Sequence, residues 1–146
     1  MPLYLNRPAH DELLAIVEER LPNESGGLLI GFRAGKNICI EHIVEVDGPR
    51  GPAHYVLREA EREKALSAWR RRHPSNTRSG YVGTWHSHPG PAGPSPRDWL
   101  TFGCRSTRTK DAIGMIVATR LGPGQWKLIG MELRRRLPAQ CEVVVV

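Results

Sequence analysis

The sequence is poor in cysteine and has no long hydrophobic run, and both absences exclude broad classes of protein. Its three cysteines, Cys39, Cys104 and Cys141, are odd in number and far apart, which fits neither a disulfide framework nor a cysteine zinc knuckle. We interpret them as packing residues, because a catalytic Cys104 would need a histidine base that nothing in the sequence assigns to it. No segment approaches the roughly 20 apolar residues of a membrane span, and residues 1–7 lack the hydrophobic region of a signal peptide. We therefore expect a cytoplasmic protein with no membrane partner.

Aromatic residues are also few, at 6%, although the net charge is +6. The arginine cluster at 70–72 ends a predicted helix that opens with Glu59, Glu61 and Glu63, and this arrangement complements the helix dipole. A surface for single-stranded nucleic acid requires aromatic residues among its basic ones. The arginine cluster at 134–136 has no interleaved aromatic residues. We therefore predict no nucleic-acid partner. We keep the hypothesis that the cluster at 134–136 attracts an acidic protein partner.

Length and composition fit one globular domain over residues 1–146, because 40% hydrophobic and 25% charged residues supply a core and a solvated surface. The first helix is predicted from Pro8 to the break at Pro22, with Leu13 and Val17 on its buried face. The other predicted elements are strands at 26–33, 37–46, 54–57, 79–88, 112–119, 125–132 and 141–146, helices at 59–72 and from Ser95, and a loop at 47–52. This pattern alone predicts an α/β or α+β fold.

Two details of these strands are specific enough to check. The first two strands are joined through Ala34-Gly35, a predicted hairpin turn, and Ile40 and Val44 in the second are predicted to face the core. The tail at 141–146 is strongly β-forming. We expect it to add to the sheet or to another subunit, because an unpaired strand of this kind is an aggregation hazard.

Two histidines lie at the end of the strand predicted at 79–88. Alternate side chains share one face of a strand, so His86 and His88 project together while Ser87 points to the other side. Pro89 then stops the strand. Each histidine taken alone is more often a surface or core residue than a metal ligand. The pair, however, has the spacing of two ligands that converge at a strand end.

A third ligand for such a site is available from the next element. In the run 95–98, Ser95 is a strong N-cap, a proline follows at the first helical position, and Asp98 lies in the first turn. An ordinary capping box between Ser95 and Asp98 is the alternative. Two imidazoles and one carboxylate leave the fourth tetrahedral position of Zn²⁺ open for water, as in catalytic zinc sites. The sequence therefore predicts hydrolytic zinc chemistry.

A group that takes the proton of the attacking water is also needed, and Glu24 can supply it. Glu24 lies directly before a glycine-flanked apolar strand. If that strand pairs with the one that bears His86 and His88, the carboxylate lies at the site and can act as general base and acid. The alternative is that Glu24 is a solvated turn residue.

Together these residues resemble the pattern of the JAMM (MPN+) zinc metalloproteases. Glu-Ser-Gly-Gly-Leu-Leu-Ile-Gly at 24–31, Trp-His-Ser-His-Pro at 85–89 and a serine followed three residues later by an aspartate carry the resemblance, which spans about residues 9–133. It implies an MPN/JAB fold, cytidine deaminase-like, in which helices flank a mostly antiparallel central sheet.

The resemblance also implies a role for each site residue. His86, His88 and Asp98 would hold zinc, Glu24 would be the general acid and base, and Ser95 would help to stabilise the tetrahedral oxyanion. Six residues separate His88 from Ser95 here, whereas the well-known eukaryotic members have seven. Among the site residues, the shorter loop therefore bears most on where Ser95 lies relative to the metal ligands.

The activity implied by the resemblance is that of a peptidase or isopeptidase acting after the C-terminal glycine of a ubiquitin-like protein or of a conjugated bacterial target. The chain looks most like the stand-alone JAB peptidases of bacterial ubiquitin-like conjugation operons, including CBASS-type antiphage systems, with E1-like and E2-like operon partners. The alternatives are a JAMM peptidase that processes a sulfur-carrier protein or a small peptide or cysteine adduct, and a non-catalytic MPN scaffold. We expect the substrate tail to bind as an added strand, along the segment 47–54 or 73–79, where His54 is a possible substrate-side residue.

Overall fold

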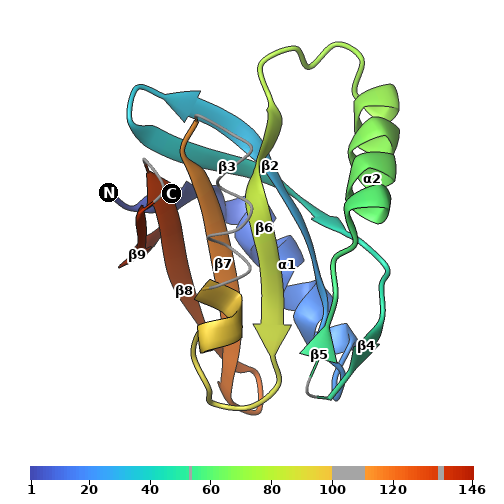
Figure 1. Cartoon of the computed structure of the whole chain (residues 1–146), viewed down its shortest axis with the longest axis vertical. Helices are drawn as coiled ribbons and strands as arrows, with labels where there is room; N and C mark the ends of the chain where they lie inside the picture. The colour runs from blue at the N-terminus through green and yellow to red at the C-terminus, as the bar shows by residue number, and fades with distance from the viewer. Residues whose placement is uncertain (53, 100–110, 135–136) are drawn as a thin grey trace.

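The computed structural model describes residues 1–52, 54–99, 111–134 and 137–146, and most of its strands join one mixed sheet (Figure 1). The strand order is β10-β1-β3-β2-β6-β7-β8-β9. The strands are β1 (Leu3–Leu5), β2 (Gly26–Ala34), β3 (Asn37–Glu45), β6 (Gly80–His88), β7 (Ile113–Gly122), β8 (Gln125–Arg134), β9 (Leu137–Cys141) and β10 (Val143–Val145). Antiparallel pairings outnumber parallel ones among these described strands. The predicted α+β class, with a mostly antiparallel sheet flanked by helices, is confirmed.

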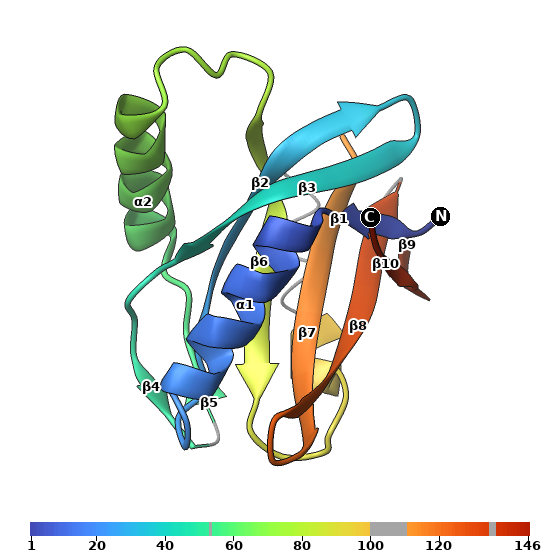
Figure 2. The ribbon, with the colours of Figure 1, turned by 180° about the vertical axis from the view of Figure 1, so that it is seen from behind.

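The helix α1 (Arg7–Glu19) covers one face of the sheet (Figure 2). The side chain of Asn6 caps it by accepting a hydrogen bond from the Ala9 N–H at 2.9 Å. Its buried residues include Leu13 and Val17, as predicted, and they pack on Leu29 of β2. Burial of each of these leucine and valine side chains contributes about 1.5–3 kcal/mol to folding.

The helix α2 (Glu59–Arg72) packs on the opposite face, because it covers the alternate residues of β2. Leu66 and Trp69 of α2 lie against Leu28 and Ile30. Acidic residues lie in its first turn and the arginines 70–72 in its last, so the charge arrangement predicted for this helix is confirmed. None of the helices in the described part of the chain is long and apolar enough to cross a membrane.

The hairpin of β2 and β3 differs from its prediction in two ways. Ala34 pairs with Asn37, so the turn residues are Gly35 and Lys36, with Gly35 at a φ of 62°, a conformation that favours glycine. Ile40 and Val44 both pack against core residues, as predicted, but on opposite faces of the sheet. The register shifts between Ile30 and Gly31, and this irregularity reverses the alternation, so Val44 packs on the α2 face.

A second, two-stranded sheet replaces part of the loop that the breakers at 47–52 predict. It consists of β4 (Arg50–Gly51) and β5 (His54–Tyr55). The short strand predicted at 54–57 is therefore present but ends at Tyr55. This small sheet lies beside the end of β6 (Figure 1).

The tail adds to the main sheet, as predicted. β9 pairs antiparallel with β8, and β10 pairs parallel with β1. The free cysteines Cys39 and Cys141 are half-buried, and Cys141 packs against the core, in agreement with packing roles. Cys104 lies outside the described residues.

The arginine cluster at 134–136 is described only at its first member. Arg134 closes β8 and hydrogen-bonds to Glu132 and to the carbonyl oxygen of Lys36. Its guanidinium is therefore already engaged within the chain. The other two arginines lie outside the described residues.

Candidate metal centre

The candidate centre begins at the end of β6, where the side chains alternate as predicted. Ser87 is buried, with 1% of its surface exposed, whereas His86 and His88 are half-buried. The two imidazole rings lie with their centroids 5.0 Å apart. Both histidines therefore open toward one side of the strand end.

Asp98 reaches this pair from a helical turn at 96–99. Its Oδ1 lies 3.2 Å from the Nε2 of His86, and its Oδ2 lies 3.5 Å from the Nε2 of His88. The turn is fixed by a reciprocal capping box, in which the Asp98 N–H donates to Ser95 Oγ at 3.1 Å and the Ser95 N–H donates to Asp98 Oδ2 at 2.7 Å. The capping box and the approach to the histidines thus coexist.

The loop between β6 and this turn is anchored at one carbonyl oxygen. That of Ala92 accepts hydrogen bonds from His88 Nδ1 at 3.0 Å and from the Thr119 hydroxyl at 2.9 Å. Because a carbonyl oxygen can only accept, His88 carries its proton on Nδ1. Its Nε2 lone pair is then directed toward Asp98 and free to bind a metal.

The donor set fits a zinc ion. One ligand atom each from His86, His88 and Asp98 lies within 4.8 Å of the others, and two nitrogens with one oxygen are ligands that zinc accepts. Among the described residues the buried Nε2 of His86 has no hydrogen-bond partner. Its 3.2 Å approach to Asp98 lacks hydrogen-bond geometry, and such an atom is costly to bury unless something binds it.

The Asp98 carboxyl is held in its ionised form. Burial by itself would raise its pKa, but the close imidazole of His86 and the backbone N–H and side chain of Ser95 outweigh burial and hold the pKa of Asp98 well below its usual range. The group therefore offers a negatively charged ligand oxygen at neutral pH.

Glu24 lies beside the same cluster, because β2 pairs with β6 and places Gly26 opposite His86. Only 7% of Glu24 is exposed, so the alternative of a solvated turn residue is wrong. Its Oε1 lies 3.6 Å from His88 Nε2. A carboxylate therefore stands at the centre in addition to the three candidate ligands.

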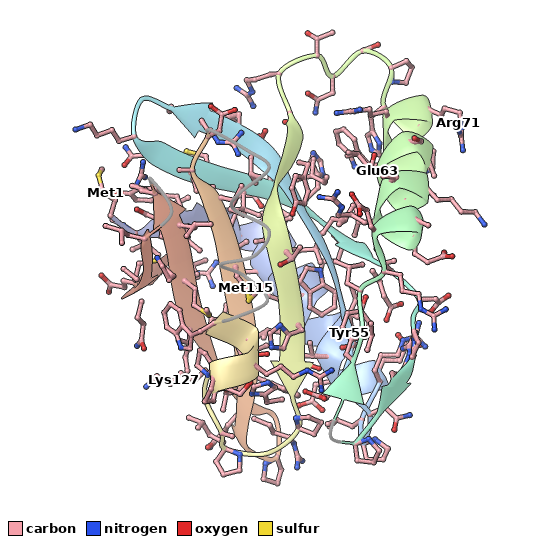
Figure 3. The ribbon with its side chains drawn as sticks, viewed as in Figure 1. Met1, Tyr55, Glu63, Arg71, Met115 and Lys127 are labelled. Atoms are coloured by element: carbon pink, nitrogen blue, oxygen red, sulfur yellow. The ribbon has the colours of Figure 1, made fainter. Side chains whose placement is uncertain are left out.

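These groups line a pocket of about 350 Å³, whose opposite wall the sequence did not reveal. That wall contains Tyr55, the last residue of β5, and Leu57 just after it. Met115 of β7 also lines the pocket. Figure 3 shows Tyr55 and Met115 on either side of β6. The sequence feature that relates to this wall is Gly26, because a Cβ at that position would lie 2.2 Å from a ring carbon of Tyr55.

The two predicted groove segments have different outcomes. Pro52, from the segment 47–54, lines the pocket, while the side chain of His54 lies outside the described part of the chain. The segment 73–79 enters β6 at the end opposite His88 (Figure 1) and supplies none of the described lining residues. It is therefore not a wall of this pocket.

Comparison with known proteins places this geometry in context. Residues 6–123 match the family model described as prokaryotic homologs of the JAB domain. A protein from Desulfitobacterium hafniense, solved in solution, shares 23% identity at a TM-score of 0.75 over 99% of this chain and 92% of its own. A JAB1/MPN domain protein from Archaeoglobus fulgidus shares 20% identity at a TM-score of 0.53 over 97% of this chain and 99% of its own. No curated protein matches the sequence.

Proposed function

This chain belongs to the prokaryotic homologs of the JAB domain, and we propose that it is a zinc-dependent metallopeptidase. The family has the JAB/MPN fold and includes zinc peptidases. The observation that carries the proposal is the convergence of His86, His88 and Asp98 within 4.8 Å, with the Glu24 carboxylate in the same pocket. A site of this composition suits hydrolysis of an amide bond.

In this proposal His86, His88 and Asp98 hold the metal. When bound, Zn²⁺ would act as a Lewis acid and lower the pKa of a water ligand toward about 7. The hydrogen bond from His88 Nδ1 to the Ala92 carbonyl orients that imidazole, and the Ser95 N–H orients the Asp98 carboxylate. Such supporting bonds fix the ligand geometry before the substrate arrives.

Glu24 is the proposed general base and acid. Its Oε1, 3.6 Å from His88 Nε2, is placed to accept a proton from the attacking water. The same carboxyl then donates that proton to the departing amine, which leaves as a neutral group. Burial beside the cluster keeps the proton transfer out of bulk solvent.

Ser95 is the proposed stabiliser of the oxyanion. Its Oγ accepts from the Asp98 N–H at 3.1 Å, and its own hydroxyl proton remains available to the substrate. That proton can be donated to the carbonyl oxygen as negative charge develops on it. Ser95 therefore serves as helix cap and as donor at once.

The proposed substrate is the flexible C-terminal tail of a ubiquitin-like protein or of a conjugated target. β5 pairs with β4, and the proposed mode of binding is the addition of the extended tail as a strand beside this small sheet. Tyr55 lies on β5 and lines the pocket. A narrow glycine end of the tail would pass between that wall and the metal ligands.

The narrower biological assignment is deconjugation in a bacterial ubiquitin-like system of the antiphage type. It rests on the resemblance of the motif and on the retention of all three ligands with the base. A non-catalytic scaffold is disfavoured by that same set, because scaffold relatives have usually lost ligands.

The test offers the purified protein the ubiquitin-like or target protein encoded beside its gene, extended at its C-terminus. We expect about one bound zinc ion per chain and a single cut after the terminal glycine, mapped by mass. His88→Ala should lose both metal and cleavage, whereas His10→Ala on the surface of α1 should keep both. A well-folded wild-type protein that binds no zinc would overturn the proposal.

A further inference from the structure

A pair of buried serines joins the Glu24 segment to the strand that bears the two histidines. Ser25 and Ser87 are 0% and 1% exposed. The Ser25 N–H donates to Ser87 Oγ at 2.9 Å, the Ser87 N–H donates to the Ser25 carbonyl at 2.9 Å, and the two hydroxyl oxygens lie 3.1 Å apart. No side chain of this pair has a role in the mechanism above.

This contact replaces one bond of the sheet ladder. The regular pairing of β2 with β6 ends at Gly26 and His86. The next opposed residues of an antiparallel pair would exchange two backbone bonds. Here one of the two is made by the Ser87 hydroxyl in place of its carbonyl.

Glu24 is the first residue beyond this point, and both peptide planes that flank its Cα are held. Its own N–H donates to the Gly51 carbonyl of β4 at 2.8 Å. The following N–H, that of Ser25, donates to Ser87 Oγ. Two held planes leave Glu24 little freedom in φ or ψ, so the direction in which its side chain leaves the backbone is set.

We infer that Ser87 is a positioning residue, which fixes the carboxylate of Glu24 relative to His86 and His88 through its hydroxyl acceptor. The inference rests on the proposed function for its catalytic consequence. Ser87 lies between the two histidines in sequence and points to the opposite face. One residue therefore links the position of the base to the position of the ligands without touching the metal.

The first experiment removes the acceptor. We expect Ser87→Ala to keep its zinc and to lower kcat about 100-fold with little change in KM, as displacement of a reacting group by about 1 Å does. Ser25→Ala should have a smaller effect, because the Ser25 N–H still donates to Ser87. The matched control is Ser79→Ala, just before the other end of β6, where the buried hydroxyl donates to Glu41 at 2.9 Å. Its kcat should equal that of the wild type.

An isosteric pair separates the hydrogen bond from packing. Ser87→Thr keeps the hydroxyl and Ser87→Val replaces it with a methyl group at the same shape. We expect Ser87→Thr to retain most of the wild-type kcat and Ser87→Val to match Ser87→Ala. Equal losses in the threonine and valine variants would overturn the inference.

Amide hydrogen exchange supplies a readout that needs no substrate. Exchange at residues 24–26 should accelerate in Ser87→Ala and Ser87→Val and stay at the wild-type rate in Ser87→Thr and Ser79→Ala. Unchanged exchange in Ser87→Ala, or faster exchange with wild-type kcat, would overturn the positioning role. If the wild type cleaves no substrate offered, the proposed function fails, and the exchange rates still decide whether Ser87 holds Glu24.

Discussion

His88 donates through Nδ1 to the carbonyl oxygen of Ala92, 3.0 Å away, and Thr119 donates to the same oxygen. The loop that joins β6 to the helical turn is thereby tied to His88 at one end and to β7 in its middle. Only six residues separate His88 from Ser95, yet Ser95 and Asp98 lie in the pocket with the histidines. The shared carbonyl gives a physical reason for this.

Thr119→Val should weaken zinc binding about 10-fold, because loss of one supporting bond frees the loop that orients His88. Competition against a chromogenic chelator measures the affinity. Thr77→Val, in the segment at the far end of β6, is the matched control and should bind zinc as the wild type does. Equal affinities in all three proteins would contradict the supporting role of Thr119.

Glu24→Ala should keep about one zinc ion per chain and lose about 100- to 10,000-fold in turnover, because the base is removed and the ligands are not. Metal analysis and cleavage of the extended substrate measure the two effects. Near wild-type turnover would show that another group takes the proton.

Ser95→Ala should lower turnover about 100- to 1,000-fold through loss of the oxyanion donor and unfold at lower denaturant, by about 1 kcal/mol, through loss of the cap. Ser95→Asp separates the two roles, since aspartate caps a helix but has no hydroxyl to donate. Its stability should return while its turnover stays low. Recovery of turnover together with stability would mean that Ser95 acts only as a cap.

Gly26→Ala should destabilise the fold by about 1–3 kcal/mol, because the added Cβ would lie 2.2 Å from the ring of Tyr55. In a Tyr55→Ala background the ring is absent, so the same change should cost much less. Chemical denaturation of the four proteins measures this coupling. Additive losses would show that the ring does not limit the space at Gly26.

Cys141 should make stability depend on pH in the alkaline range. Burial, with the nearby Glu132, raises the pKa of its thiol from 9.0 to about 11. The folded state therefore favours the neutral thiol, so the contribution is complete below about pH 9 and is lost as the pH rises through about 11. The difference in unfolding free energy between the wild type and Cys141→Ala should shrink from pH 8 to pH 10.5, and a constant difference would contradict this.

Local patterns were enough to predict the strand that ends at His88 and the helical start at Ser95, because each depends on residues close in sequence. The pairing that brings Glu24 alongside joins segments far apart in the chain, and the sequence supplied it only as a condition of the site. The pocket wall at Tyr55 and the bond from Thr119 to Ala92 were not predictable in this way. Both depend on contacts between segments that only the folded sheet brings together. The inversion at Val44 likewise follows from a register shift that a single strand does not encode.

The two outermost strands of the main sheet, β9 and β10, are separated in the chain by Glu142 alone. The final residue is also fastened, since the Arg7 N–H donates to the Val146 carbonyl and the Val146 N–H donates to the Leu5 carbonyl. One short segment thus ties the first strand of the chain to β8. A protein cut before Leu137 would lose both outermost strands together and expose the edges of β8 and β1 to neighbouring molecules, so trimming by a protease would favour edge-to-edge stacking of the sheet.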